Sequence, residues 1–161
     1  MSTRKATRAD LCRVLEIYQR ARIYMQGTGN PTQWGTVYPP VELVEQDIQG
    51  GNLFLLDDGG EIYGVFAFFP EGDSCYDVID GAWLNDMPHA AIHRVASAGT
   101  RKGVLYDCVS FCLTQSKNLK IDTHSDNKIM QHQLKKAGFV ECGTIYLENK
   151  EPRIAFQLFA E

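Results

Sequence analysis

The chain has no long apolar run, no excess of positive charge and no paired-cysteine motif, and each absence excludes a class of protein. A membrane-spanning helix needs about 18 or more consecutive apolar residues, and no segment provides them. Nonspecific nucleic-acid binding needs a basic surface, whereas the formal net charge here is -4. The N-terminal stretch MSTRKATRADLC holds no apolar segment of a signal peptide. We therefore expect neither membrane nor nucleic acid as a partner.

The cysteines are 5 in number and form no C-x-x-C pair. Cys108 and Cys112 are four residues apart on an expected helix, where free cysteines behave as small buried apolar residues. Such spacing does not favour a structural zinc site, so no metal is expected. Free thiols without an export signal indicate the cytoplasm as the location of the protein.

The chain has the length and composition of one globular domain spanning residues 1–161, with 44% hydrophobic and 22% charged residues. Apolar periodicity and turn residues predict strands at 2–6, 52–58, 61–70, 89–97, 119–124, 139–147 and 152–159. They predict helices at 7–25, 41–49, 102–115 and 127–137. This order favours a mixed sheet flanked by helices.

The segment from residue 119 to residue 146 is the most informative one. After a strand, the residues at 125–127 are Ser, Asp and Asn, all of which can cap a helix. Met130, Leu134 and Ala137 then recur at helical spacing, and Gly138 can adopt the left-handed conformation that ends a helix. Taken alone, the pattern is also that of an ordinary capped helix lying on a sheet.

The part from Asn127 to Phe139 resembles the closing motif of the GCN5-related N-acetyltransferase (GNAT) superfamily. In that motif an Asn opens a helix and a Gly-Phe pair closes it, and Asn127, Lys136, Gly138 and Phe139 fall at matching places. The resemblance implies an α/β (α+β) fold with a mixed, mostly antiparallel sheet of six to seven strands and about four helices. It further implies splayed fourth and fifth strands, parting near Ala96 and Asp122.

A second stretch, residues 93–106, consists of a strand, a Gly-rich turn and the start of a helix. Free amides at a helix start and the helix dipole favour an anion. Gly99 and Gly103 would let a phosphate approach the backbone, and Arg101 and Lys102 add positive charge. The alternative interpretation is a tight turn that happens to hold two glycines.

This stretch is similar to the pyrophosphate loop of the same superfamily, whose form is Gln or Arg, two residues, Gly, one residue, and Gly or Ala. Gly103 fits the first glycine, whereas Thr100 and Leu105 depart from the pattern. Leu105 would either crowd the phosphate or turn into the core. The resemblance implies acetyl-coenzyme A (acetyl-CoA) as co-substrate, and Asn127 would contact its arm or hold the splayed strands apart. The implied cofactor-binding residues are Val95, Ala96, Gly99, Thr100, Arg101, Lys102, Gly103, Val104, Leu105 and Asn127.

Acetyl transfer to an amine needs a base, donors to the developing oxyanion, and in some cases a proton donor to the thiolate. His93 and His124 are the candidate bases, although each is equally typical of a structural or surface histidine. On an alternating strand His93 would share a face with Val95 and Ser97. Backbone amides near Ala96 and Ser97 would be the oxyanion donors.

The proton donor of the superfamily is commonly a Tyr seven residues after the Asn, and that position is Leu134 here. Tyr146 and Tyr106 are the possible substitutes. The thiolate would otherwise leave without a dedicated acid.

The Gly- and Pro-rich loop at residues 26–40 is the candidate acceptor site, because long loops without regular structure are usually functional. Its candidate substrate-binding residues are Asn30, Gln33, Trp34 and Tyr38. Trp34 would alternatively only pin the loop to the core. Trp83 with the connection at 77–86 would form the opposite wall, and Asp80 and Asp86 would attract a cationic amine.

The sequence therefore predicts an N-acetyltransferase that moves an acetyl group from acetyl-CoA to a primary amine by direct attack in a ternary complex. The acceptor would be a small-molecule amine or a peptide amine, and the superfamily resemblance allows a homodimer. Leu105 and Leu134 favour the alternative, a non-catalytic CoA-binding or regulatory domain. A plain interaction module remains if both motifs are coincidental.

Overall fold

The computed structural model describes residues 1–161, and its eight strands form one sheet in the order β1-β2-β3-β5-β6-β8-β7-β4. All neighbouring strands are antiparallel except β5 and β6, which are parallel. The strands are β1 (Ser2–Lys5), β2 (Leu53–Asp58), β3 (Glu61–Phe69), β4 (Asp80–Gly81), β5 (Ala90–Ser97), β6 (Asn118–Thr123), β7 (Val140–Tyr146) and β8 (Pro152–Phe159).

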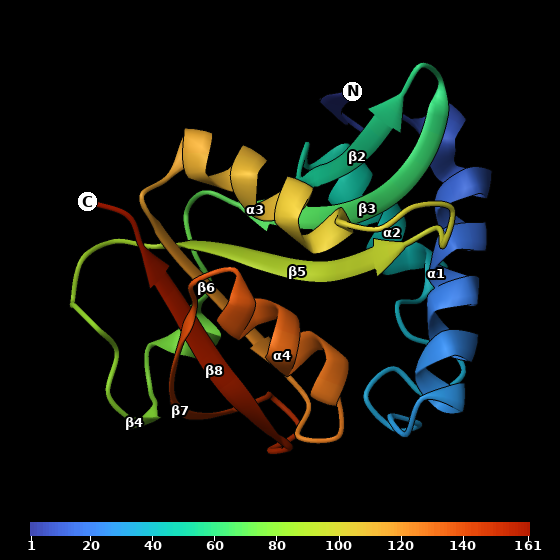
Figure 1. Cartoon of the computed structure of the whole chain (residues 1–161). Helices are drawn as coiled ribbons and strands as arrows, with labels where there is room; N and C mark the ends of the chain where they lie inside the picture. The colour runs from blue at the N-terminus through green and yellow to red at the C-terminus, as the bar shows by residue number, and fades with distance from the viewer.

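Four helices cover the two faces of the sheet, α1 (Leu11–Gly27), α2 (Val41–Gln49), α3 (Val104–Gln115) and α4 (Lys128–Lys136) (Figure 1). The apolar side chains of α1 and α2, such as Val14 and Val44, form one core cluster with Leu55 and Val65 of the sheet. Those of α3 and α4 form a second cluster against the other face. Burial of apolar side chains on both faces is the main stabilising contribution to such a layered fold.

The predicted mixed, mostly antiparallel sheet with four helices is confirmed, but it has eight strands instead of six to seven. The additional strand is β4, which pairs with β7 through Asp80–Thr144 and Gly81–Gly143. A Cβ atom at Gly81 or at Gly143 would collide with the backbone of the opposite strand, so two glycines permit this close approach. The sequence left room for a short strand in the irregular connection at residues 70–86, but two residues have no periodicity that would fix its place.

The parallel strands β5 and β6 separate soon after they begin. They pair only at Ala90–Leu119 and Ala91–Lys120, and beyond these residues they diverge toward α1 (Figure 1). The predicted splay is confirmed, although it begins earlier in both strands than Ala96 and Asp122. Cavities therefore lie along the open edges of the two strands, where ladder hydrogen bonds would otherwise form.

A β-bulge interrupts β5 at Arg94, which has a positive φ of 53°. The register with β3 shifts between Val65–Ala96 and Ala67–His93, so Arg94 and Val95 have no partner there. Because the bulge breaks the alternation of side chains, Ile92 and Val95 both contact the cluster under α3 and α4. His93 therefore lies on the opposite face from Val95, and the expectation that they share a face was wrong.

Three elements near the N-terminus hold Arg94 in this conformation. The hydroxyl of Tyr18 on α1 donates to the Arg94 carbonyl oxygen at 3.0 Å. The guanidinium of Arg94 makes a bidentate ion pair with Asp47 of α2, at 2.8 and 2.9 Å. It also donates to the hydroxyl of Tyr38, at 3.3 Å. We call the Tyr18, Asp47 and Tyr38 contacts to Arg94 the bulge clasp, because they offset the cost of a positive φ at a residue with a side chain.

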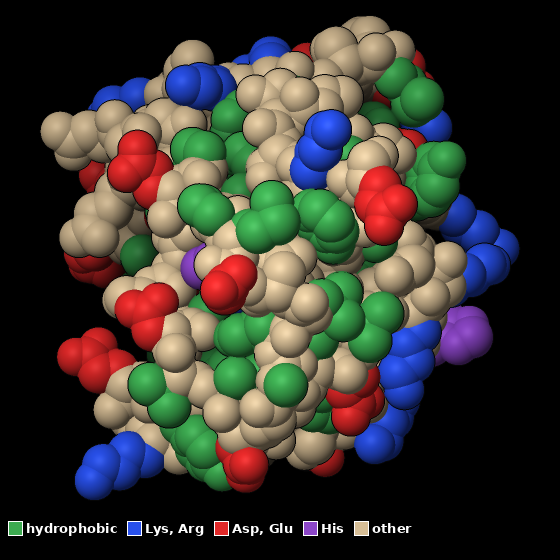
Figure 2. Space-filling model, turned by 90° about the vertical axis from the view of Figure 1, so that its left-hand side faces the viewer, with side chains coloured by type: hydrophobic (Ala, Val, Ile, Leu, Met, Phe, Trp, Pro, Cys, Tyr) green, Lys and Arg blue, Asp and Glu red, His purple; other side chains and the backbone are tan.

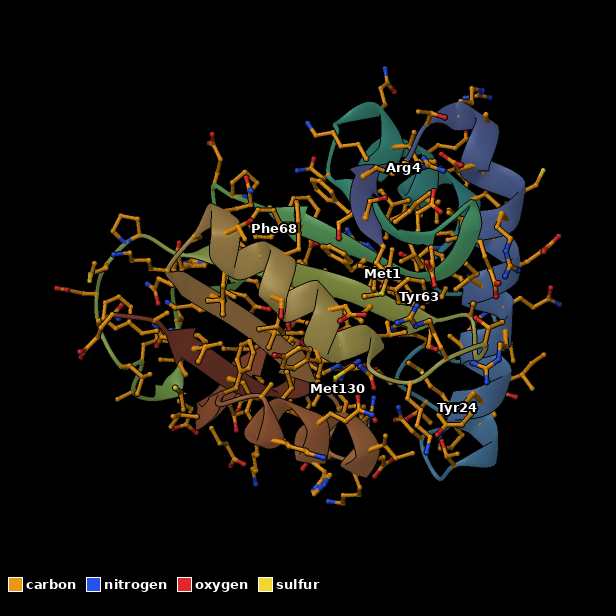
Figure 3. All side chains as sticks on the ribbon, turned by 45° about the horizontal axis from the view of Figure 1, so that its top comes forward. Met1, Arg4, Tyr24, Tyr63, Phe68 and Met130 are labelled. Carbon is orange, nitrogen blue, oxygen red and sulfur yellow. The ribbon has the colours of Figure 1, made fainter.

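At the sheet edge formed by β1, Arg4 lies between two carboxylates, those of Asp10 and Asp57 (Figure 3). The hydrogen bond from Arg4 lowers the pKa of Asp10 to about 2. Asp10 also accepts a hydrogen bond from the Thr7 amide at 2.7 Å, which caps the chain as it enters α1. These contacts join the first strand to the first helix.

No helix of the protein has the length and apolar character needed to cross a membrane. Apolar side chains lie among acidic ones on the side of the molecule that carries β4 (Figure 2). The connection between β3 and β5 leaves Val78, Leu84 and Met87 exposed. All five cysteines are free, and Cys108 and Cys112 are buried, as the sequence predicted.

Candidate active site

Two clefts open where β5 and β6 diverge. The first, here called the helical cleft, has a volume of about 820 Å³ and is lined by residues of α1, β5, the start of α3, and α4. The second, here called the loop cleft, has a volume of about 950 Å³ and is lined by the loop at 32–38 and by residues of β3, β5 and β6, among others. Four residues line both clefts, namely Met25, Val95, Asn127 and Met130.

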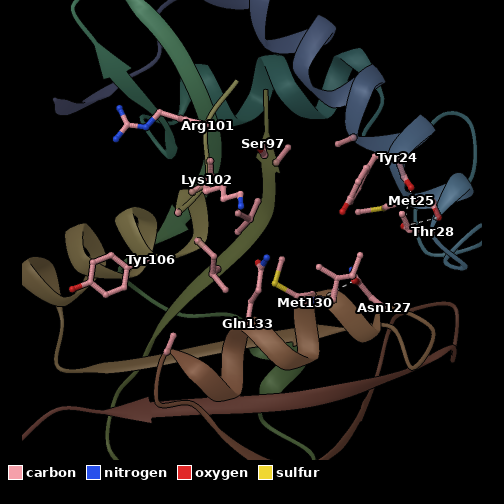
Figure 4. A pocket seen from close by; sticks show the side chains of 18 of the residues that line it. Tyr24, Met25, Thr28, Ser97, Arg101, Lys102, Tyr106, Asn127, Met130 and Gln133 are labelled. Carbon is pink, nitrogen blue, oxygen red and sulfur yellow. Dashed lines mark hydrogen bonds between the residues drawn. The ribbon is translucent and has the colours of Figure 1, made fainter. Parts of the chain in front are cut away.

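The helical cleft is positively charged. Its lining includes Arg20, Arg101, Lys102 and Lys136, and it includes no Asp or Glu. Lys102 points into the cleft, whereas Arg101 points away from it (Figure 4). Arg101 donates to Asp58 at 2.8 Å and lies 4.2 Å from the centre of the Tyr63 ring. Arg101 therefore ties the loop to the β2–β3 hairpin, and the charges left for an anionic ligand are mainly those of the other three residues.

The start of α3 supplies backbone donors to the same cleft. Gly103 precedes the helix with a left-handed φ of 87°, and no atom lies within 4 Å of the place where a Cβ would be. The amides of the first helical turn have no partner within the helix, and the helix dipole adds partial positive charge. Leu105 is buried and packs with the core cluster under α3, and it also contributes to the lining of the cleft.

Gly99 packs closely against Arg20 of α1 and lies outside the lining of the helical cleft. A Cβ at Gly99 would collide with the guanidinium of Arg20, which donates to the Ser97 carbonyl oxygen at 3.1 Å. Gly99 and the exposed Thr100 are not among the residues that line the helical cleft. The other predicted cofactor-binding residues, Val95, Ala96, Arg101, Lys102, Gly103, Val104, Leu105 and Asn127, do line it.

Sequence reasoning missed Arg20 and Tyr24, which line the helical cleft from α1. The Arg20 guanidinium lies 5.6 Å from the centre of the Tyr24 ring. Tyr24 on α1 and Met130 on α4 line this cleft from its two sides (Figure 3). Arg20 and Tyr24 are four residues apart on α1, about one turn of the helix. Polar residues at this spacing are equally typical of an ordinary solvent-exposed helix face, so the sequence did not single them out.

Asn127 joins the loop at residues 26–40 to the start of α4. Its Oδ1 accepts from the Met130 amide at 3.0 Å, and its Nδ2 donates to Gln33 Oε1 at 3.0 Å. Gln33 in turn donates to the Thr123 hydroxyl at the end of β6, at 3.4 Å. Asn30 also donates to Gln33 Oε1, at 2.8 Å. The loop is thus attached to both the strand and the helix on the far side of the gap.

The four predicted substrate-binding residues divide into two groups. Gln33, Trp34 and Tyr38 line the loop cleft, whereas Asn30 is buried and does not. Trp34 also packs edge-on against Tyr18 with 5.6 Å between ring centres. Trp34 therefore pins the loop to the core and lines the cleft at the same time.

His93 lies in the loop cleft as one half of a hydrogen-bonded pair. Its Nε2 is 2.8 Å from Oδ2 of Asp73, which lines the same cleft. This contact with His93 lowers the pKa of the Asp73 carboxyl. With the proton of a neutral imidazole on Nε2, the lone pair of Nδ1 is available as a base. The partner Asp73 was not predicted, since it lies 20 residues earlier in an irregular connection.

Of the other candidate catalytic residues, His124 and Tyr146 lie outside both clefts. His124 Nδ1 accepts from the Asp126 amide at 2.9 Å, and its Nε2 is 3.3 Å from the Thr32 hydroxyl. Tyr146 is 52% exposed on β7 and lines neither cleft. Tyr106 does line the helical cleft but is 70% exposed, and its ring points away from Lys102 (Figure 4).

Leu134 is completely buried in the core under α4. The residues that α4 presents to the helical cleft are Ile129, Met130, Gln133 and Lys136. None of them is an ordinary proton donor to a thiolate at neutral pH except the lysine. The place of the usual tyrosine is therefore taken by a side chain that faces the sheet.

The acids of the loop cleft are not those that the sequence indicated. Asp80 and Asp86 are exposed and lie outside its lining, whereas Asp73 and Asp122 belong to it. The Tyr76 hydroxyl donates to Asp122 Oδ2 at 2.6 Å. Burial raises the pKa of Tyr76, so its hydroxyl remains a hydrogen-bond donor.

Trp83 does not itself line the loop cleft. Its indole nitrogen donates to the Tyr76 carbonyl oxygen at 2.9 Å, and this hydrogen bond helps to fix the position of Tyr76. The Lys120 ammonium lies 4.0 Å from the centre of the Trp83 ring. No group of three or more His, Cys, Asp and Glu side chains is arranged to hold a metal ion.

Comparisons with known proteins agree on the fold. No family model and no curated protein matches the chain. Among solved structures, a GNAT-family acetyltransferase from Streptococcus agalactiae matches with a TM-score of 0.89 and 25% identity, over 99% of this chain and 95% of that one. A GNAT-family acetyltransferase from Listeria monocytogenes matches with a TM-score of 0.66 and 16% identity, over 99% and 94%.

A protein from Salmonella typhimurium, provisionally named an acetyltransferase and solved with its cofactor acetyl-CoA, matches with a TM-score of 0.65. It is 12% identical, over 99% of this chain and 94% of that one. The chain therefore has the fold of the GCN5-related N-acetyltransferases, and these neighbours support the resemblance that the segment from Asn127 to Phe139 carries.

Proposed function

We propose that the protein is an acetyl-CoA-dependent N-acetyltransferase in which both substrates are bound at once. The observation that carries this proposal is the meeting of two clefts at Val95, Asn127 and Met130, where β5 and β6 have separated. A donor in one cleft and an acceptor in the other would bring their reacting groups together at this point. Direct attack in a ternary complex needs no nucleophile from the protein.

The helical cleft fits acetyl-CoA in its charge and shape. The free amides at the start of α3, with Lys102 and Lys136 nearby, suit a pyrophosphate. The open backbone of β5 at Val95 and Ala96 suits the amide groups of the pantetheine arm, because β6 no longer pairs with this part of the strand. Acetyl-CoA would supply the activated acetyl group, and the protein would orient it toward the loop cleft.

In the loop cleft, His93 would remove a proton from the acceptor amine, directly or through water, while Asp73 orients the imidazole. Backbone amides of β5 beyond the bulge, near Val95 to Ser97, would stabilise the developing oxyanion. The burial of Leu134 leaves no acid at the superfamily's usual position, and the tyrosines that line the helical cleft are Tyr24 and Tyr106 instead. A coenzyme A thiolate leaving without a dedicated proton donor is consistent with this arrangement.

Replacement of Gly103 by Glu tests the donor site. The carboxylate would enter the space that is open beside Gly103 and repel a pyrophosphate, so we expect acetyl-CoA binding in calorimetric titration to be lost. The positive φ at Gly103 makes any side chain strained, so Gly103→Asn is the matched control. Asn tolerates this backbone conformation and carries no charge, and we expect it to retain binding within about tenfold.

Release of free coenzyme A that depends on an added amine would distinguish catalysis from the alternative, a CoA-binding domain without activity. Acetyl-CoA binding without amine-dependent release would support that alternative. No binding of acetyl-CoA by the unmodified protein would exclude both.

A further inference from the structure

The lining of the loop cleft contains carboxylates besides that of Asp73, which is hydrogen-bonded to His93. Of its ionisable lining residues, Arg94 is neutralised by Asp47 in a bidentate pair, and Arg153 lies 3.3 Å from Glu151. Asp73 and Asp122 remain without a lysine or arginine partner. Asp73 is hydrogen-bonded to His93, so its carboxylate already takes part in orienting the base. Asp122 is hydrogen-bonded to Tyr76 and not to His93.

Asp122 is held in place but is not neutralised. It is half-buried, and its Oδ2 accepts from the Tyr76 hydroxyl, whereas its Oδ1 has no hydrogen-bond partner in the protein. Lys120, two residues earlier on the same face of β6, lies over the Trp83 ring and makes no ion pair. A partly desolvated carboxylate without a cation is costly, so a cation supplied by a ligand would stabilise it.

Asp122 also lies close enough to His93 to bind the far end of an acceptor whose amine is at His93. Extension of the β5–β6 register from Ala91–Lys120 sets His93 opposite Asp122 across the gap, with both side chains on the same face of the sheet. Tyr76 lies between them, with its ring centre 5.9 Å from that of His93 and its hydroxyl on Asp122. Phe69, Trp34 and Tyr38 add aromatic surface to the same cleft, which suits an alkyl segment.

From this arrangement we propose that the acceptor carries a second group, cationic at neutral pH, besides the amine that is acetylated, and that Asp122 binds this group. The acceptor class is thus a diamine or a related polycationic amine. The inference rests on the proposed function, because it concerns the acceptor of that reaction. It disfavours α-amino acids and other acceptors with a nearby carboxylate, since both arginines of the cleft are already paired.

Three amines with four carbons test the proposal, namely 1,4-diaminobutane, 1-aminobutane and 4-aminobutanoate. They share the reacting amine, whereas the far end is an ammonium in the first, an uncharged methyl group in the second and a carboxylate in the third. We expect kcat/KM to fall in that order, with about a 10- to 100-fold advantage of the diamine over aminobutane, as for a partly buried charged hydrogen bond. Equal values for the three, or a preference for the carboxylate, would overturn the proposal.

Asp122→Asn is the informative variant, because the amide oxygen can still accept from Tyr76 while the charge is lost. We expect the diamine advantage to shrink to about twofold, with aminobutane turnover changed much less. Asp86→Asn, which removes an exposed charge outside the clefts, is the matched control and keeps the full advantage. An advantage that survives in Asp122→Asn would assign the selectivity to another residue and refute the proposal.

Calorimetric titration of each amine into the protein saturated with coenzyme A keeps this inference separate from the proposed function. A tighter dissociation constant for the diamine than for aminobutane, lost in Asp122→Asn, supports the cation site even if no acetyl transfer is observed. Acetyl transfer to aminobutane with no preference for the diamine supports the proposed function and refutes the cation site.

Discussion

Replacement of His93 by Gln is expected to lower kcat by about 10²- to 10⁴-fold, the usual contribution of a positioned general base. Glutamine keeps a hydrogen-bonding group near Asp73 but cannot accept a proton at neutral pH. His93 does not line the helical cleft, so the dissociation constant of acetyl-CoA should change less than about twofold. Steady-state kinetics with a diamine acceptor and calorimetric titration with acetyl-CoA measure the two quantities.

The division of the loss between kcat and KM provides a second measure. If His93 is the base, the loss should appear mainly in kcat, whereas KM for the acceptor amine should change much less. His132→Gln is a suitable control, since His132 is exposed on α4 and lines neither cleft. A kcat within about threefold of the unmodified enzyme in His93→Gln would place the base elsewhere.

Replacement of Asp47 by Asn is expected to lower both stability and kcat, because it breaks the bulge clasp. It leaves the guanidinium of Arg94 largely buried without its carboxylate, and removal of one partner of a buried pair costs about 3–5 kcal/mol. For a protein of this size the melting temperature should fall by roughly 6–20 °C. Exposed Arg8, whose ion pair with Glu45 lies on the surface, provides the control variant Arg8→Met, which should melt nearly as the unmodified protein does.

A double replacement distinguishes a clasp that positions the reaction from one that only stabilises the fold. Asp47→Leu with Arg94→Met removes both charges and should recover much of the lost stability, as apolar replacements of buried ion pairs often do. If the clasp positions the bulge, kcat should remain low in this stable variant. Recovery of kcat together with the melting temperature would show that the clasp acts on stability alone.

The sequence predicted the elements that depend on local patterns. The bounds of α2 agree with the prediction at Val41 and Gln49, and α4 begins after the Asn127 cap, as its capping side chain indicated. In both cases the signal lies in the helix itself and in its flanking residues. The order of strands and helices followed from the same kind of local evidence.

The features that the sequence could not predict depend on residues far apart in the chain. The bulge at Arg94 requires Tyr18 and Asp47, which are 76 and 47 residues away. The pairing of His93 with Asp73 and that of Tyr76 with Asp122 likewise bring together an irregular connection and two different strands. Periodicity carries no information on such contacts, so alternation along an uninterrupted strand gave the wrong face for His93.

The early separation of β5 and β6 has a consequence for how the chain acquires its site. On one side of the gap stand β1, β2, β3 and β5, which all precede residue 98. On the other side stand β6, β8 and β7, which all follow residue 117, and the two-residue strand β4, which comes from the earlier part of the chain and pairs with β7. The helical cleft takes residues from both parts, from Arg20 to Tyr106 and from Asn127 to Ala137. A chain divided between α3 and β6 would yield two fragments, neither of which contains the complete helical cleft. Binding of acetyl-CoA to a mixture of the two fragments would therefore report their reassembly.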